Sequence, residues 1–222
     1  MGIQTLGHRR GQILYQTVRG VRLAWIGFSP YPNHNSVLDL TTARTLVRQA
    51  RNQADVVIIS AHMGAEGTSA LHVHDRNEVF FGELRGNPIH FSRAMVASGA
   101  DLVLGHGPHV PRAIEVYRGK LIAYSLGNFI GYGALSTAGE MGYSLILEVR
   151  LRADGQLVGA RVIPIVISPN GIPLPDSRKR TIHLLQRLNR QDMPHSEWLL
   201  GDDGVFRPRV YPNSANLTRS GS

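Results

Sequence analysis

Residues Asp101–Gly133 read DLVLGHGPHVPRAIEVYRGKLIAYSLGNFIGYG. The stretch begins with a short apolar run, Leu102 to Leu104, and enters a turn in which glycine and proline flank His106 and His109. Many α/β proteins use a strand that ends in such a turn to deliver side chains to a site at the carboxyl edge of a sheet. The sequence therefore predicts that this stretch forms the floor of a metal or phosphate site.

The rest of this stretch predicts a hairpin and a second compact loop. The runs AIEVY (113–117) and LIAYS (121–125) flank the turn Arg118–Gly119–Lys120. The sequence SLGNF (125–129) follows and contains Asn128. We expect this loop to belong to the same floor of the site.

Upstream, the pattern alternates between strand and helix. Val21–Phe28 is a dense apolar run followed by Gly, Pro and Asn residues, which predicts a buried strand and then a loop over Ser29–Ser36. Asp39–Gln53 has apolar residues at helical spacing, with Thr41 or Thr42 expected to cap the helix. Val56–Ile59 is continuously apolar and β-branched, as in a parallel strand covered on both faces.

A long polar connection and a second helix follow. Thr68–Pro88 is long for a connection within a compact domain, which favours a functional lid or site wall. Ile89–Ser98 predicts a helix that leads to the strand at Asp101–Leu104. In a right-handed parallel arrangement, the loops after the strands at 56–59 and 101–104 share one edge of the sheet. We therefore expect His62 to lie beside His106 and His109.

Downstream, the pattern becomes antiparallel. Tyr143–Leu151 and Gln156–Val166 flank a hairpin turn, Ser168–Asp176 predicts a loop, and Thr181–Leu188 predicts a short helix. The expected fold is α/β with a sandwich-like second part. We divide the chain into a domain over residues 1–190 and an edge element with a flexible tail over residues 191–222.

Composition limits the classes of function. The 222 residues include no cysteine, so metal ligands would have to be His, Asp, Glu or Asn. The formal charge is +8, mostly from dispersed arginines, which indicates either a solvated surface or an anionic ligand. Base-stacking aromatic residues are not interleaved with the arginines, so we expect no nucleic-acid partner. No apolar run is long enough for a membrane span, and we expect the chain as given to be soluble.

Three histidines are the candidate ligands. His62, His106 and His109 follow strands that the topology brings together, and imidazole is a common ligand of divalent metals. The alternative is that each histidine is an ordinary loop or core side chain with its hydrogen bonds satisfied. The residue pattern leaves both interpretations open.

The segments SAHMGAEG (60–67) and GADLVLGHGPHVPRAIEVYRGKLIAYSLGNFIGYG (99–133) resemble the characteristic segments of the CapA family of capsule and poly-γ-glutamate biosynthesis proteins. That family has a calcineurin-like metallophosphatase fold with four α/β/β/α layers. An HWG-type turn, a GHxPHV turn, an IExYxGK hairpin and a YSLGNF loop follow one another in the same order. The similarity covers about residues 20–165 and involves several independent blocks.

The resemblance implies a set of site residues. His62, His106 and His109 would be ligands of divalent metal ions (Mn, Fe, Zn or Mg), and these three histidines with Asn128 would be the catalytic residues. A second set, Glu66, Arg112 and Ser125, would contact the substrate. The implied substrate is an anionic polymer or a phosphoester, and the implied partner is a membrane-bound capsule synthesis complex. The full-length protein would then be exported or associated with the membrane.

Two departures from the family pattern weaken an assignment as a hydrolase. Gly107 stands where the family commonly has a further histidine. The first half of the family's two-metal site has no counterpart here, and we expect Asn33, His34 and Asn35 to lie outside the site because they follow the wrong strand. The chain thus resembles the C-terminal part of a CapA protein, and an apolar sheet face open to water is expected. The alternatives are a non-catalytic subunit that binds an anionic polymer, or an inactive fragment.

Overall fold

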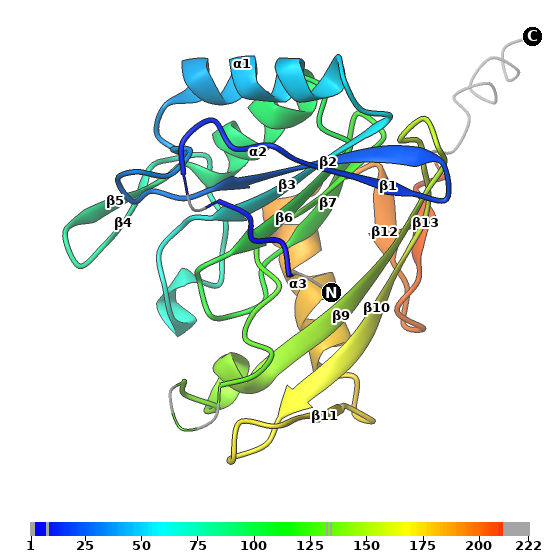
Figure 1. Ribbon diagram of the computed structural model, residues 1–222. Helices are drawn as coiled ribbons and strands as arrows, with labels where there is room; N and C mark the ends of the chain where they lie inside the picture. Colours follow the sequence, from blue (N-terminus) through cyan, green and yellow to red (C-terminus); the bar gives the residue numbers. More distant parts are fainter. Residues whose placement is uncertain (1–2, 8, 132, 134, 211–222) are drawn as a thin grey trace, which may run out of the picture.

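The computed structural model describes residues 3–7, 9–131, 133 and 135–210. Its centre is a six-stranded sheet in the order β1-β2-β3-β6-β8-β7 (Figure 1). Strands β2, β3, β6 and β8 are parallel, while β1 and β7 are antiparallel to their neighbours. The strands of this sheet are β1 (Leu14–Val18), β2 (Val21–Phe28), β3 (Val56–His62), β6 (Leu102–His106), β7 (Ile114–Tyr117) and β8 (Lys120–Ala123).

Alternating side chains on the central strands feed two separate cores. Ile26, Ile59 and Val103 pack in the core on the helical side of the sheet. Ile58 and Leu102 pack in the core on the other side. Because both faces are covered, the parallel strands are continuously apolar, as the sequence predicts.

Two helices cover the first face of the sheet, α1 (Leu40–Arg51) and α2 (Pro88–Ala97) (Figure 1). The Asp39 carboxylate accepts a hydrogen bond from the Thr42 N–H, so Asp39 caps α1 and the expectation that a threonine caps it is wrong. Asn87 caps α2 in the same way, and Pro88 occupies the first turn, where no N–H is needed. No helix in the described part of the chain is long and apolar enough to cross a membrane.

A smaller antiparallel sheet covers part of the second face. It has the order β11-β10-β9, with β9 (Tyr143–Leu151), β10 (Leu157–Ile167) and β11 (Pro173–Pro175). An apolar groove of about 430 Å³ lies between the central sheet and β9, the edge strand of this small sheet. Leu23, Trp25, Ile58 and Leu147 are among its lining residues. The groove agrees with the expectation of an apolar face open to water.

The outer edge of the central sheet is covered by α3 (Arg180–Asp192) and the segment after it. Asn189 accepts a hydrogen bond from the Ile114 N–H, and the Ser196 hydroxyl accepts one from the Val116 N–H. The Glu197 N–H donates in turn to the Val116 carbonyl. These contacts satisfy backbone groups of β7 that an open edge would leave to water or to another chain.

The structure contains several short elements that the sequence does not predict. β1 lies upstream of Val21, where no element is predicted from the sequence, and the long connection contains a hairpin, β4 (Glu78–Phe80) with β5 (Glu83–Gly86). The remaining short elements are the 3₁₀ turns Thr68–Ala70 and Gly139–Gly142 and the strands β12 (Trp198–Leu200) and β13 (Phe206–Pro208). The flexible tail predicted at the C-terminus lies partly outside the described residues. The α/β class with a second sheet is confirmed.

Candidate functional site

Two of the predicted histidines are neighbours on adjacent parallel strands. His62 ends β3, His106 ends β6, and the two residues are paired in the register of the sheet. The strands extend further than the sequence indicates, so both histidines are the last strand residues rather than loop residues. His62 lies an even number of residues after Ile58, as His106 does after Leu102, so both histidines are on the face of the central sheet that packs against the second sheet. The prediction that His62 lies beside His106 is confirmed.

His62 is held in an environment that favours its neutral form. Burial is the largest cause of its lowered pKa, followed by the positive charge of Arg85, and His109 and His106 act in the same direction. Its Nε2 is buried without a hydrogen-bond partner. Burial also lowers the pKa of His106. Two neutral imidazoles therefore stand side by side at the carboxyl edge of the sheet.

His109 is oriented by Asn128. Its Nδ1 lies 2.7 Å from Asn128 Oδ1, while the Asn128 amide nitrogen donates to the Met141 carbonyl at 3.3 Å. Since the amide oxygen can only accept, His109 must donate from Nδ1, which leaves Nε2 as the nitrogen available to a ligand. His109 has a φ of 60°. The Ser144 hydroxyl donates a hydrogen bond to the Asn128 carbonyl. The turn and the SLGNF loop thus form one unit, as expected.

Glu66 connects His109 to an arginine that the sequence analysis did not identify. Glu66 Oε2 lies 3.6 Å from His109 Nε2, and Glu66 Oε1 accepts a hydrogen bond of 3.0 Å from Arg85. Arg85 also donates to the Tyr31 hydroxyl at 2.8 Å and pairs with Glu83 at 3.0 Å. Arg85 comes from β5 within the long connection, where no motif marks it. The expectation that this connection forms a site wall agrees with this placement.

Arg112 holds the segment 65–78, part of the site wall, through buried contacts. Its side chain is fully buried, pairs with Glu78 at 3.0 Å, and donates to the carbonyl groups of Ala65 and Ala70. Burial lowers the pKa of this guanidinium, and Glu78 opposes that effect. Its hydrogen bonds go to the segment 65–78, so no contact in the structure supports the predicted role of Arg112 in substrate binding.

Ser125 and Gly107 shape the backbone of the site. The Ser125 hydroxyl is buried and accepts a hydrogen bond from the Gly127 N–H inside the SLGNF loop. Gly107 has a φ of 117°, and a side chain there would approach His62 Nε2 and the Met63 backbone within 3.2 Å. The close approach and the positive φ together explain a glycine at this position.

A cavity of about 450 Å³ opens at this edge of the sheet. His62, His106 and Ser60 line it together with Ser29, Tyr31 and His34 from the loop after β2. The expectation that His34 lies outside the site is therefore wrong. The sheet order held the signal, because β2 is the neighbour of β3 and its following loop must reach the same edge.

The side chains at the site are of the types that bind divalent metals. Imidazole nitrogens, the Glu66 carboxylate and the Asn128 amide are ordinary ligands of such ions, and the unpartnered Nε2 of His62 is an atom that a bound group would satisfy. Within residues 3–210, leaving aside those not described, no three His, Asp or Glu side chains are placed together as a ligand set. A metal at this site would need further donors, such as water or the oxygens of a substrate.

Comparison with known proteins gives a consistent family. The model of the family described as "Bacterial capsule synthesis protein PGA_cap" matches residues 1–132. The PGA biosynthesis protein CapA of Bacillus subtilis is 32% identical over 136 residues, which cover 57% of this chain and 32% of that protein. A probable polyglutamine synthesis accessory protein of Mycobacterium tuberculosis is 26% identical over 210 residues, covering 88% of this chain and 47% of that protein.

The chain is thus shorter than its relatives, and it spans between 32% and 47% of the length of these two proteins. Among solved structures, a 5'-nucleotidase precursor from Thermus thermophilus shares 13% identity at a TM-score of 0.39, covering 82% of this chain and 34% of that one.

Proposed function

The chain belongs to the family of bacterial capsule synthesis proteins, PGA_cap, and from that premise we propose that it acts in capsule or poly-γ-glutamate biosynthesis. Its site would act on a phosphoester or an anionic polymer, as a metal-dependent hydrolase of the phosphoesterase type. The observation that carries the proposal is the pairing of His62 with His106 at the carboxyl edge of the sheet.

In this proposal His62, His106 and His109 would hold a divalent metal, with further ligands from water or substrate. The chemistry that the metal would supply is activation of water and polarisation of a phosphoryl or carboxyl oxygen. Asn128 fixes the His109 tautomer that presents Nε2, and Glu66 lies beside that nitrogen. Orienting partners of this kind are typically worth about 10–100-fold in metal affinity or activity.

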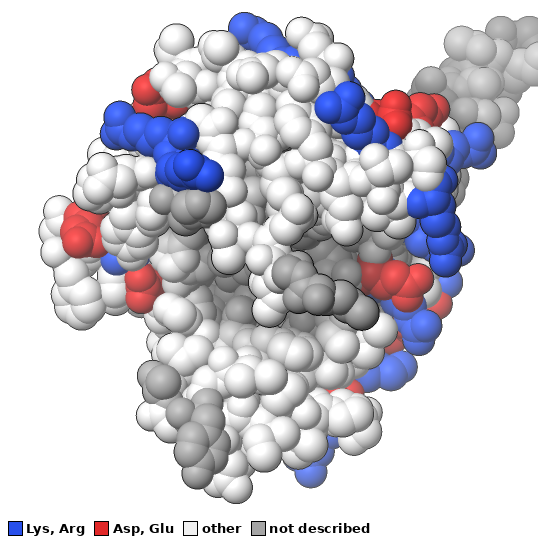
Figure 2. All heavy atoms as spheres, viewed as in Figure 1, with Lys and Arg blue, Asp and Glu red and all other residues white. Residues whose placement is uncertain are grey.

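The formal net charge of +8 supports an anionic partner. On the face shown in Figure 2, Lys and Arg side chains lie along the right margin, together with Asp and Glu, and in a further group at the upper left, while the centre of the face is mostly uncharged. The attraction between a basic protein and an anionic polymer acts over distances of about 10 Å at moderate salt. We propose that the chain meets such a polymer, with a peripheral contact to a membrane-bound synthesis complex, and that it binds no nucleic acid.

A second candidate function is binding without catalysis. It is favoured by one observation, that the described residues contain no complete set of metal ligands. In this case the histidine cavity would hold an anionic group of the polymer, and binding would require no metal uptake.

One experiment separates the two candidates. The purified chain is titrated with Mn²⁺ by calorimetry and assayed with p-nitrophenyl phosphate and with poly-γ-glutamate. The hydrolase proposal expects Mn²⁺ uptake that requires His62 and turnover that His106→Ala abolishes. The matched control is His183→Ala, which changes an exposed histidine of α3. Polymer binding without metal uptake or turnover would support the binding module instead.

A further inference from the structure

The histidine cavity has a third histidine, from the loop after a third strand, for which neither the sequence pattern nor the family resemblance provides a role. His34 lies in the loop after β2 and lines the cavity with His62 and His106. β2, β3 and β6 are consecutive in the sheet. We propose that His34 binds the ligand of this cavity by donating a hydrogen bond from Nε2 to an anionic oxygen, phosphoryl or carboxylate.

The loop that carries His34 is firmly built. Asn35 is buried, donates to the Gly27 carbonyl at 3.0 Å and accepts from the Gly11 N–H at 2.7 Å. The Ser29 N–H donates to the Asn35 carbonyl, and the Val37 N–H donates back to the Ser29 carbonyl. These bonds fix the backbone on both sides of His34, so its ring position is determined by the fold.

Ser29 is the hydrogen-bond partner of the His34 ring. The Ser29 hydroxyl accepts a hydrogen bond from the Tyr31 N–H at 3.1 Å and lies 2.9 Å from His34 Nδ1. The hydroxyl can donate to Nδ1 or accept from it, so this contact permits the neutral tautomer with its proton on Nε2, which is the tautomer that the proposal uses. Nε2 has no hydrogen-bond partner among the described residues. His34 is half-buried, so water can accept from Nε2 until a ligand oxygen takes its place.

A donor at Nε2 would bind an acceptor oxygen, and the net charge of +8 favours an anionic one. The Arg85 guanidinium lies 5.3 Å from the centroid of the Tyr31 ring, which lies 5.7 Å from the His62 ring. Arg85 is itself paired with Glu66 and Glu83, so its charge is largely offset.

The inference deepens the proposed function, because it concerns the same cavity, and its test is independent of catalysis. Inorganic phosphate and γ-linked triglutamate are titrated into the ¹⁵N-labelled chain in the presence of a chelator, and dissociation constants are read from chemical-shift changes. His34→Ala should weaken binding about tenfold or more, the usual effect of losing a hydrogen bond to a charged group. His34→Gln retains an N–H donor and should lose less.

The control and the partner variant sharpen the test. His183→Ala should leave both dissociation constants unchanged, since His183 is an exposed residue of α3. Ser29→Ala frees the ring without removing it, so its loss should be smaller than that of His34→Ala. Binding of only one probe assigns the oxygen to phosphoryl or to carboxylate, and either result supports the role if His34→Ala weakens it.

Two outcomes overturn the inference. One is unchanged affinity in a folded His34→Ala chain, judged by its thermal melting curve, and the other is no binding of either probe by the parent chain. Anion binding that depends on His34 without any hydrolysis would reject the hydrolase proposal but keep this one. Hydrolysis that is unchanged in His34→Ala, together with unchanged anion affinity, would keep the hydrolase proposal and reject the role of His34.

Discussion

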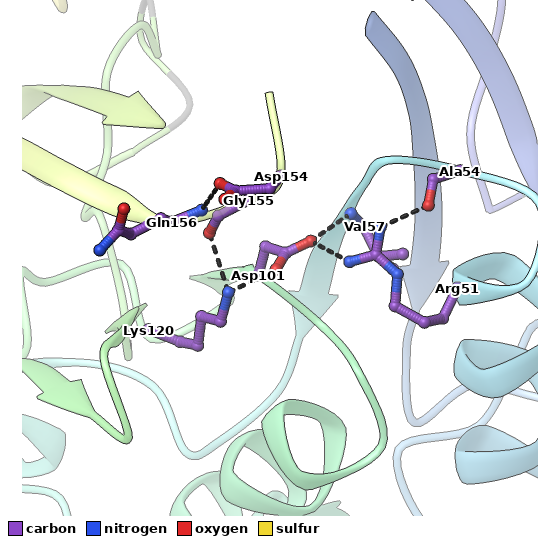
Figure 3. A network of polar contacts seen from close by, with 8 residues as sticks. All are labelled: Arg51, Ala54, Val57, Asp101, Lys120, Asp154, Gly155 and Gln156. Carbon is purple, nitrogen blue, oxygen red and sulfur yellow. Dashed lines mark hydrogen bonds and ion pairs between the residues drawn. The ribbon is translucent and has the colours of Figure 1, made fainter. Parts of the chain in front are cut away.

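Lys120 Nζ lies 2.6 Å from Asp101 Oδ1, at the edge of the central sheet opposite the histidine cavity (Figure 3). The other oxygen of the same carboxylate accepts from Arg51 at 2.7 Å and from the Val57 N–H at 2.8 Å. Lys120 also donates to the Gly155 carbonyl in the β9–β10 turn. One buried carboxylate thus joins α1, β3, β8 and the second sheet.

Asp101→Asn should therefore lower the free energy of unfolding by about 3 kcal/mol, because two cations would lose a buried partner. Lys120→Met should cost less, since Arg51 still neutralises Asp101. Urea denaturation of both variants gives the comparison. Equal costs for the two variants would show that the carboxylate is not the centre of this network.

Gly107→Ala should destabilise the chain by about 2 kcal/mol through its positive φ. The matched control is Gly119→Ala, which has a φ of 70° but no neighbour within 4 Å of an added Cβ. Any excess cost at Gly107, measured by chemical denaturation, reports the contact with His62 and Met63 together with the strain of its larger φ of 117°. A smaller cost at Gly107 than at Gly119 would mean that the backbone relaxes there.

The sequence predicts the parallel core and the His62–His106 pairing for physical reasons. Continuous β-branched runs require burial on both faces, and parallel strands present their carboxyl ends at one edge. Short elements such as β1 and the β4–β5 hairpin are poorly marked, because their side chains are half-exposed and the turns decide their existence. The hairpin turn uses Phe81 at a φ of 48° followed by Gly82, a conformation that residue type indicates only weakly.

Arg85 and His34 show what sequence alone leaves out. Arg85 reaches Glu66 only because the hairpin folds back over the site, a long-range arrangement without a local signal. The position of His34 could have been predicted, because β2 and β3 are neighbours in the sheet and the loop after β2 therefore reaches the same edge. The motifs of the family lie in other turns, those that carry His62, His106 and Asn128.

Glu78→Gln should cost about 3 kcal/mol of stability, because it leaves the fully buried Arg112 guanidinium without its counter-charge. Asp203→Asn breaks an exposed pair with Arg207 and should have little measurable effect. Thermal and urea unfolding check both variants. Arg112→Met tests the predicted role in substrate binding directly, and we expect lower stability with unchanged affinity for phosphate.

The stability of the chain should fall as the pH drops below the ordinary histidine pKa of 6.5. Burial lowers the pKa of His62 and of His106 in the folded state, so between the folded pKa and 6.5 the unfolded chain binds more protons than the folded one. Stability is therefore present above this window and is lost as the pH falls through it.

Each of these two histidines can contribute a slope of at most about 1.4 kcal/mol per pH unit. His106→Gln should flatten the dependence of the unfolding free energy on pH between about pH 7 and pH 5, the range around the ordinary histidine pKa. His183→Gln, an exposed change, should keep the slope of the parent chain. An unchanged slope in His106→Gln would mean that this imidazole takes up its proton without opposing the fold.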